Sequence, residues 1–126
     1  MKEKFNNYND GFLRVYKDRE IRTDFSAKKN VKNLEGLEFI VKLGYAECSK
    51  RQQDFEFSET IGRSLNLKVK TRLYRSVTNK HKVLIDNILY DIFEVDIDRG
   101  KQEMYLYMEE VRTIDITNYL TRYKKL

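Results

Sequence analysis

The most regular stretch of the chain reads Leu65-Asn66-Leu67-Lys68-Val69-Lys70-Thr71-Arg72-Leu73. Its odd-numbered residues are apolar or, at Thr71, β-branched, whereas its even-numbered residues are polar or basic. In an extended strand successive side chains point to opposite faces, so the odd-numbered residues share one face. A helix would spread the three basic residues around its circumference instead. The stretch therefore predicts a half-buried β-strand whose other face carries Lys68, Lys70 and Arg72.

Similar strand patterns recur on both sides of this stretch. They cover residues 12–16, 20–25, 38–49, 82–86, 88–96 and 104–111. Gly44 lies inside one of them, and a glycine within a strand indicates a bulge or a bend. Asp86-Asn87 and Asp98-Arg99-Gly100-Lys101 are typical of tight reversals between strands. Short strands separated by such turns predict an all-β fold, either a small antiparallel β-barrel or a sandwich.

The other segments complete a single domain that spans residues 1–126. Residues 1–11 are polar and rich in asparagine, which indicates a loose N-terminal arm. Residues 50–63 mix polar and aromatic positions, and we expect a partly ordered hairpin or a projecting loop there. Residues 114–126 place apolar side chains at helical spacing behind Asp115, a candidate N-cap, so they predict a short C-terminal helix or tail.

The composition indicates a folded, soluble protein. Hydrophobic residues make up 40% of the chain, and nine tyrosines with seven phenylalanines supply bulky core material. Cys48 is the only cysteine, so no intrachain disulfide can form and a reducing compartment is expected. No apolar run approaches the ~18 residues of a membrane span, and the first residues lack the apolar segment of a secretory signal. We therefore expect a cytosolic protein without membrane contact.

Groups that could perform chemistry are few. His81 is the only histidine, and its turn-like surroundings indicate a solvated side chain rather than a partner for Cys48. Cys48 ends a strand pattern and is expected to be a small buried side chain. Asp96, Asp98 and Gly100 resemble the start of a calcium loop, but basic residues interrupt it and the closing glutamate is missing. The sequence thus predicts no enzymatic activity, no metal and no cofactor.

Charge is distributed unevenly along the second half of the chain. Residues 63–82 contain seven basic and no acidic residues, and residues 83–110 contain eight acidic and two basic residues. In one interpretation these charges pair across neighbouring strands within the sheet, each pair contributing a few tenths of a kcal/mol. In a second, the two blocks form opposite flanks that join successive copies head to tail. In a third, the basic strand and nearby aromatic residues form an OB-like surface for single-stranded nucleic acid.

The second interpretation assigns specific contact residues. The basic flank would be Lys68, Lys70 and Arg72, and the acidic flank Asp91, Glu94 and Asp96.

A series of short motifs also follows a characteristic order between residues 10 and 111. It consists of Asp10-Gly11-Phe12, Gly44-Tyr45-Ala46-Glu47, the polar segment 49–58, Leu67-Lys68-Val69-Lys70-Thr71-Arg72, Val83-Leu84-Ile85-Asp86, Leu89-Tyr90-Asp91-Ile92-Phe93, Asp96 and the strand 104–108. In this order and spacing the chain resembles the head-closure, or head–tail joining, proteins of long-tailed bacteriophages, known as the stopper family. Tyr45-Ala46 departs from the family's common Trp-Ala, Asp86-Asn87 replaces a turn that often carries glycine, and the segment after Ile114 has no counterpart.

The resemblance implies a small β-barrel that assembles as a ring, a hexamer in the virion and a monomer when free. The ring would seal the DNA-filled capsid, contact the portal-bound adaptor and the tail or tail-terminator protein, and touch packaged DNA transiently. Assembly would take place in the host cytoplasm. A loop can project into the channel of such rings, and residues 50–63 are the candidate here, with Arg51, Gln52, Gln53 and Asp54 as contact residues. A tail-completion or tail-terminator protein is a related alternative.

Overall fold

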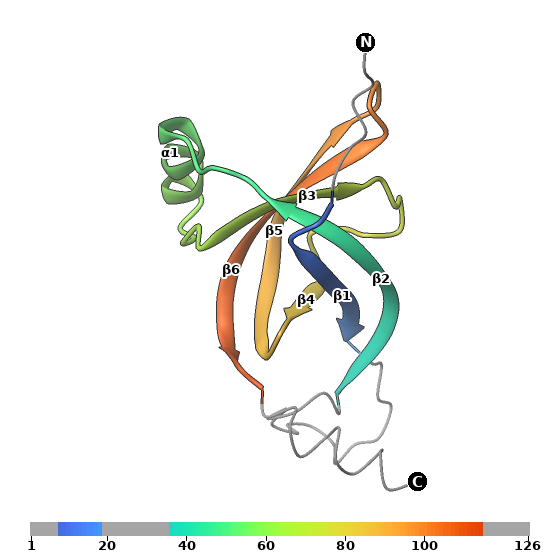
Figure 1. Cartoon of the computed structure of the whole chain (residues 1–126). Helices are drawn as coiled ribbons and strands as arrows, with labels where there is room; N and C mark the ends of the chain where they lie inside the picture. Colours follow the sequence, from blue (N-terminus) through green and yellow to red (C-terminus); the bar gives the residue numbers. More distant parts are fainter. Residues whose placement is uncertain (1–7, 19–35, 115–126) are drawn as a thin grey trace, which may run out of the picture.

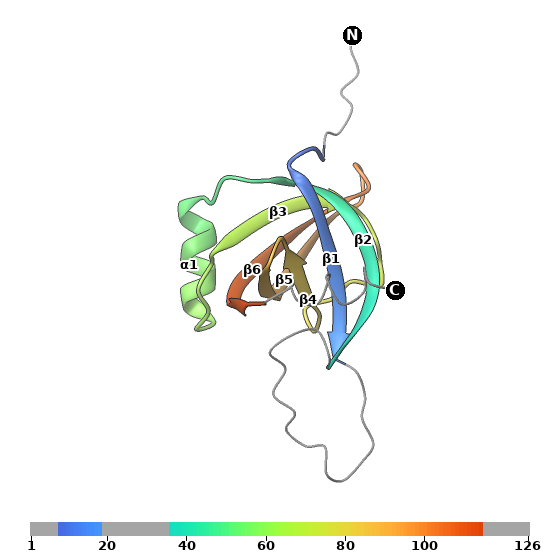
Figure 2. The ribbon, with the colours of Figure 1, turned by 60° about the horizontal axis from the view of Figure 1, so that its bottom comes forward.

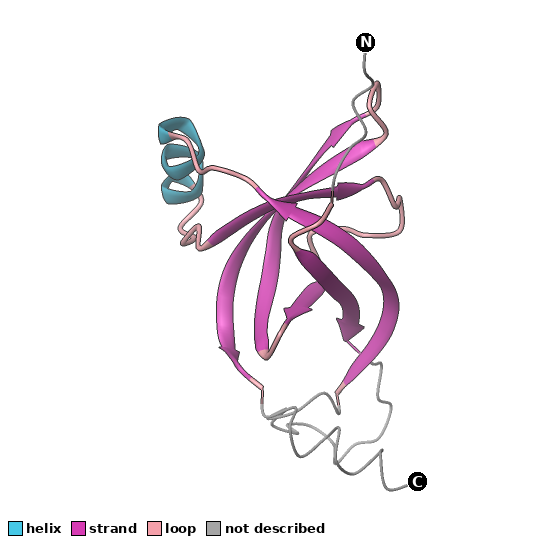
Figure 3. Ribbon diagram, in the orientation of Figure 1, coloured by secondary structure: helices cyan, strands magenta, loops and turns pink. Residues whose placement is uncertain are grey.

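The computed structural model describes residues 8–18 and 36–114 of the 126-residue chain (Figures 1 and 3). In chain order, the elements of this part are β1 (Gly11–Asp18), β2 (Leu37–Glu47), α1 (Gln52–Thr60), β3 (Leu67–Arg72), β4 (Lys82–Ile85), β5 (Ile88–Asp98) and β6 (Glu103–Thr113). The predicted strand 20–25 and the C-terminal segment after residue 114 lie outside the described residues.

The six strands form one antiparallel sheet that closes on itself. Their order is β1-β2-β3-β6-β5-β4, and β4 pairs with β1 to complete the barrel. Every strand therefore has a hydrogen-bonded neighbour on both sides, as barrel closure requires. The expected all-β fold is confirmed, and of the two predicted architectures the closed barrel is the one observed.

The barrel interior is filled by the alternating residues of the strands. Met104, Leu106 and Met108 of β6 point inward and are fully buried, together with Val69 and Thr71 of β3. The hydroxyl of Thr71 donates a hydrogen bond to the backbone carbonyl of Gly44 at 2.6 Å, so this polar group is satisfied inside the core. The alternation predicted for residues 65–73 is thus confirmed in the strand itself.

Both reversals expected among the last three strands are present. Asp86 adopts a φ of 58° in the two-residue turn between β4 and β5, a left-handed conformation that aspartate tolerates better than most residues. Residues 99–102 turn the chain from β5 into β6, and Gln102 has a φ of 56°. These turns set the register that places Met104 opposite Ile97.

Residues 50–63 contradict the expectation of a hairpin or loop. They contain the helix α1, which lies against the outside of the barrel (Figures 1 and 3). The alternation of Phe55 and Phe57 with polar residues suggested a strand, but the segment is held as a helix by its own N-terminal hydrogen bonds and by a buried ion pair described below.

Two smaller expectations are also corrected. The described end of the N-terminal arm is not loose, because the Tyr8 hydroxyl donates to Glu103 at 2.8 Å and the Asp10 backbone N–H donates to the Tyr45 carbonyl at 3.0 Å. Of the bulge or bend expected at Gly44, the bulge is absent, since Gly44 pairs in regular register with Phe12. The register shift of this strand pair lies further along, between Val15 and Tyr16 of β1.

The close approach of the N-terminal segment explains the glycine at position 44. A Cβ added at Gly44 would lie 3.1 Å from the backbone carbonyl oxygen of Tyr8. Gly44→Ala is therefore expected to lower the free energy of unfolding by about 1–3 kcal/mol, because backbone atoms must move to relieve the contact. Gly100→Ala is the matched control, since its Cβ would meet only an ordinary 3.6 Å contact. Equal urea midpoints for the two variants would contradict this explanation.

Candidate interaction site

The helix α1 is fastened to the barrel by a buried ion pair. Lys68 of β3 donates from its Nζ to the Asp54 carboxylate at 2.9 Å, and the two side chains are only 6% and 5% exposed. The Lys68 ammonium also lies 5.1 Å from the centre of the Tyr107 ring and 5.8 Å from that of Tyr105. A charged pair this well buried needs such partners, because desolvating either charge alone is costly.

Local hydrogen bonds explain why the chain turns into a helix at this point. Asp54, in the first turn, accepts a hydrogen bond from the Arg51 backbone N–H at 2.9 Å. A carboxylate at this position satisfies a backbone donor and is favoured by the helix dipole. Asp54 and Ser58 are one turn apart and both buried, so the face of α1 that meets the barrel is polar. Phe57 adds an edge contact to Tyr107, with ring centres 6.5 Å apart.

The pair shifts the ionisation of both its members. Burial alone would raise the pKa of Asp54, but the hydrogen bond from the Arg51 N–H and the Lys68 ammonium outweigh it and lower this pKa below 3.8. Burial alone would lower the pKa of Lys68, but its hydrogen bond to Asp54 outweighs burial and raises this pKa above 10.5. Both groups are therefore charged across the neutral range.

These shifts predict how the attachment of α1 depends on pH. Because the Asp54 pKa is lower in the folded chain than in the unfolded chain, its contribution to stability is present above pH 3.8 and is lost as the pH falls through the folded value. The raised Lys68 pKa gives the opposite sign, with stability present below pH 10.5 and lost at higher pH. The difference in unfolding free energy between wild type and Asp54→Asn should be constant from about pH 5 to 9 and shrink in acid. Urea unfolding across pH measures it, and a difference that grows in acid would contradict the assignment.

A shallow groove of about 260 Å³ opens between α1 and the outer face of the barrel. It is lined by Arg51, Gln53, Asp54, Phe57, Glu94, Asp96 and Tyr107. The groove thus brings together three of the four residues predicted for the channel loop and two residues of the predicted acidic flank. Gln52, the fourth, lies on the exposed part of α1, where its side-chain amide donates to Glu56 at 3.2 Å.

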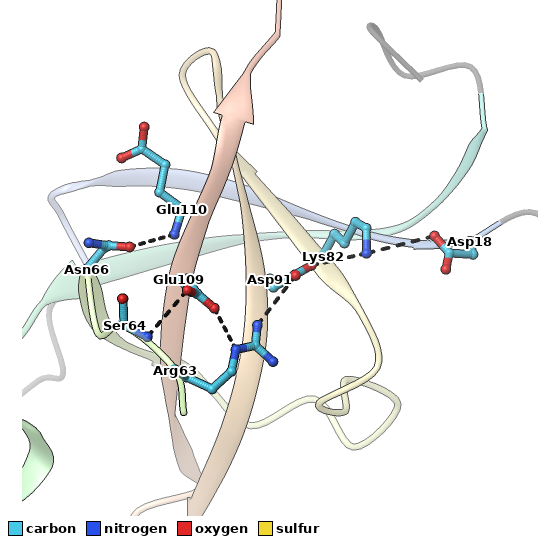
Figure 4. Close-up of polar contacts among 8 residues, drawn as sticks. All are labelled: Asp18, Arg63, Ser64, Asn66, Lys82, Asp91, Glu109 and Glu110. Atoms are coloured by element: carbon cyan, nitrogen blue, oxygen red, sulfur yellow. Dashed lines mark hydrogen bonds and ion pairs between the residues drawn. The ribbon is translucent and has the colours of Figure 1, made fainter. Parts of the chain in front are cut away.

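A second polar cluster joins β1, β4, β5, β6 and the segment that follows α1 (Figure 4). Arg63 donates to Glu109 at 2.5 Å and lies 3.4 Å from Asp91, while Lys82 donates to Asp91 at 3.0 Å and lies 4.0 Å from Asp18. Nearby, Asn66 accepts the Glu110 backbone N–H at 2.8 Å and Glu109 accepts that of Ser64 at 3.3 Å. Here the basic and acidic blocks pair within one chain, which confirms the first interpretation of the charge pattern for these residues.

The structure separates the residues predicted to form a basic flank. Lys68 is buried beneath α1, so it cannot serve as an exposed contact in this conformation. Lys70 is half-buried and lies 4.0 Å from the buried carboxylate of Glu103. Arg72 is exposed at the end of β3. The alternation gave the correct face for all three side chains, but it could not show that a helix covers the first of them.

The predicted acidic flank is divided in a similar way. Asp91 belongs to the ion-pair cluster, with Arg63 and Lys82 as its partners. Glu94 is half-buried and Asp96 exposed, and both line the groove beside α1. Glu94 and Asp96 are therefore the acidic side chains of this set that stay accessible to a partner.

Exposed aromatic residues are the feature that sequence reasoning missed. Phe55 and Phe57 on α1 are 39% and 38% exposed, and Phe12 of β1 and Phe39 of β2 are 62% and 52% exposed. The strand pattern assigned Phe12 to a strand but gave no indication of which face it occupies. The α1 residues were assigned to a loop, where exposure carries little information.

His81 and Cys48, the remaining candidates for chemistry, lie in half-buried positions. His81 is half-buried rather than solvated, its Nδ1 accepts the Thr78 backbone N–H at 3.1 Å, and burial lowers the pKa of its side chain. Cys48 follows the end of β2, is half-buried, and has its pKa raised by burial. Within residues 8–18 and 36–114, no cluster of histidine, cysteine and carboxylate side chains could hold a metal ion. The helix that this part of the chain contains is too short to cross a membrane.

Comparison with known proteins adds no family to this description. No protein-family model matches the chain, and no curated protein matches it at a significant level.

Proposed function

We propose that the protein is a ring-forming structural subunit of a bacteriophage head–tail connector, in which it acts as the head-closure protein. Its role is to seal the DNA-filled capsid and to offer a docking surface to the tail. The order of sequence motifs between residues 10 and 111 supports this proposal, and so does the small closed barrel that the resemblance implies.

The observation that carries the proposal is the placement of exposed aromatic residues on two sides of the barrel. Phe55 and Phe57 lie on α1, which contacts β3 and β6, whereas Phe12 and Phe39 lie on β1 and β2. Figures 1 and 2 show α1 and β2 on opposite sides of the molecule. Two different apolar surfaces on opposite sides suit a head-to-tail contact between copies, and repeated head-to-tail contacts form a ring where the rotation between copies closes.

The proposed partners follow from this position in the virion. One rim of the ring contacts the portal-bound adaptor, and the other contacts the tail-terminator or tail protein. The contact of the ring with packaged DNA is transient. The function is mechanical, so the protein is not an enzyme in this proposal.

Assembly with the adaptor tests the proposal directly. We expect native mass spectrometry of the protein mixed with the portal–adaptor complex of the same phage to show six added copies per complex. A free monomer in isolation agrees with the proposal, because the adaptor supplies the template. A chain that stays monomeric in the presence of both the adaptor and the tail protein would refute it. Co-purification with the tail tube in place of the adaptor would assign the related tail-completion role.

One observation favours a second candidate function, the binding of single-stranded nucleic acid. On the outer face of β1 and β2, Phe12 and Phe39 flank the exposed cations Arg14 and Lys42. Aromatic side chains alternating with cations are typical of surfaces that stack unpaired bases. This surface differs from the one expected at Lys68, which is buried. Fluorescence anisotropy with an oligothymidylate at low and high salt measures such binding, which should weaken steeply as salt rises.

A further inference from the structure

We infer that in the assembled ring the outward face of α1 in one copy packs against the outer face of β1 and β2 in the next copy. This inference rests on the proposed function and names the interface that the ring would use. The helix face consists of Phe55, Glu56 and Glu59, and the strand face consists of Phe12, Arg14, Phe39 and Lys42.

The helix face points away from the barrel and is acidic. Asp54 and Ser58 mark the buried side of α1, and a rotation of about 100° per residue places Glu56 and Glu59 on the other side, with Phe55 at its edge. All three are exposed, and the nine residues of the helix include no basic residue. Glu59 lies in the last turn, where the helix dipole already places negative charge, so its position is unfavourable in the isolated chain.

The strand face is basic, and its charges are also unfavourably placed in the isolated chain. Arg14 of β1 lies directly opposite Lys42 of β2 in the register of the sheet. Like charges in directly opposed positions repel each other and destabilise a strand pair. The Lys42 ammonium lies 4.5 Å from the centre of the Phe12 ring, and in the described part of the chain neither cation pairs with a carboxylate.

The two faces therefore complement each other in charge and in apolar character. A carboxylate of Glu56 or Glu59 placed near Arg14 and Lys42 would relieve the repulsion in the strand pair and the unfavourable charge at the helix end. Phe55 on one side and Phe12 and Phe39 on the other would lose their contact with water in the same step.

The positions of the faces on the barrel exclude a contact within one chain. α1 lies over β3 and β6. Phe39 and Lys42 lie on the part of β2 that pairs with β1, whereas β2 pairs with β3 through Tyr45–Glu47, and β1 is separated from β6 by β4 and β5. Figures 1 and 2 show α1 and β2 on opposite sides of the molecule. The two faces can therefore meet only between copies, and each copy offers one of each. This is the heterologous geometry that a closed ring needs.

Paired charge reversals test this interface. The first variant carries Glu56→Lys and Glu59→Lys, the second carries Arg14→Glu and Lys42→Glu, and the third combines all four substitutions. We expect the first and second variants to assemble on the adaptor complex about 10- to 100-fold more weakly than wild type, because each brings like charges together at every contact. The combined variant restores opposite charges, so its assembly should recover. An equimolar mixture of the first two should also recover into alternating rings.

A matched control separates the interface from a general charge effect. Arg99→Glu with Lys101→Glu makes the same change of charge at two exposed positions in the turn between β5 and β6, and it should assemble like wild type. Thermal unfolding of each variant checks that the barrel is intact, since all the changes lie on the surface.

The outcomes separate this inference from the function on which it rests. Normal rings from all three variants would refute the interface and leave the proposed function standing. No rings from wild type on the adaptor would refute the proposed function and the interface together. If Arg14→Glu with Lys42→Glu abolishes oligothymidylate binding and the combined variant recovers no assembly, the strand face binds nucleic acid and the inference is wrong.

Covalent trapping gives an independent readout. Lys42→Cys and Glu59→Cys in a Cys48→Ser background place one thiol on each face of the same chain. Under mild oxidation on the adaptor we expect a ladder of disulfide-linked oligomers that ends at the ring size. The single variants Lys42→Cys and Glu59→Cys should stop at or below the dimer. Absence of the ladder from assembled rings would overturn the assigned contact.

Discussion

Lys68→Met is expected to lower the free energy of unfolding by about 3 kcal/mol, because it leaves the buried carboxylate of Asp54 without its main counter-charge. The remaining partners of Asp54 are the Arg51 backbone N–H and the Arg51 guanidinium at 3.5 Å, whose side chain is 59% exposed and so offers a screened interaction. Because these partners remain, the loss of unfolding free energy should lie at the lower end of the range that is typical when one member of a buried ion pair is removed. Urea unfolding followed by circular dichroism measures it.

A double-mutant cycle and a neighbouring lysine make this prediction specific. Asp54→Asn keeps an oxygen that can accept the Arg51 N–H, so Asp54→Asn with Lys68→Met removes both charges with little change in shape. This pair should cost less than the sum of the single changes by at least about 1 kcal/mol. Lys70→Met is the control on the same face of β3, where the ion pair is longer, and should cost less than about 1 kcal/mol. Equal losses at positions 68 and 70 would show that α1 is not held by this pair.

Leu106→Ala is expected to have the largest effect on stability, about 2–5 kcal/mol, through loss of apolar contact and the cavity that remains. Leu106 is fully buried in the barrel interior, where Val69 of β3 and Val95 of β5 are its partners in the register of the sheet. A domain of this size has roughly 5–15 kcal/mol of total stability, so the substitution removes a large part of it.

Val111→Ala is the matched control for the core. Val111 lies on the same strand β6 but is 39% exposed, so truncation should change stability by less than about 1 kcal/mol. Thermal and urea unfolding of the two variants give the comparison. A loss at position 111 as large as that at position 106 would mean that the interior of the barrel is assigned wrongly.

The strands were predictable from the sequence because the residues that fill the barrel interior recur at every second position. In residues 104–111 the alternation places Met104, Leu106 and Met108 on one face, and these are the residues that fill the interior. The turn at Asp86-Asn87 was predictable from its residue types, and it marks the reversal between β4 and β5. Whether the sheet opens into a sandwich or closes depends on the pairing of β1 with β4, which no local pattern encodes.

The helix α1 was not predictable by the same reasoning, for a physical reason. Sequence analysis finds a helix by an apolar stripe at helical spacing, but the buried positions of α1 are Asp54 and Ser58. Phe55 and Phe57, which produced a strand-like alternation, are largely exposed. The signal that could have revealed the helix is the carboxylate of Asp54 placed three residues after Arg51, a weak pattern in a chain so rich in charge.

The candidate site was predictable only in part. Arg51, Gln53 and Asp54 were assigned to a contact loop and do line a groove, together with Glu94 and Asp96. One interpretation makes the charge blocks flanks for a partner, yet Lys68 and Asp91 pair with Asp54, Arg63 and Lys82 within the chain. Charge counts cannot distinguish internal from external partners, because that depends on which elements the fold brings together.

Closure of the sheet also bears on how the chain folds. The pairing of β1 with β4, here called the seam, consists of Arg14–Leu84, Val15–Val83 and Tyr16–Lys82. Because β2, α1 and β3 lie between these two strands in the chain, the seam closes a long loop. Contacts between such distant parts of a chain carry a high loop-closure entropy and are slow to form. The seam is short and joins the most widely separated neighbours in the barrel, so transient opening of the native protein should begin there, and amide protons of β4 that face β1 should exchange before those between β5 and β6.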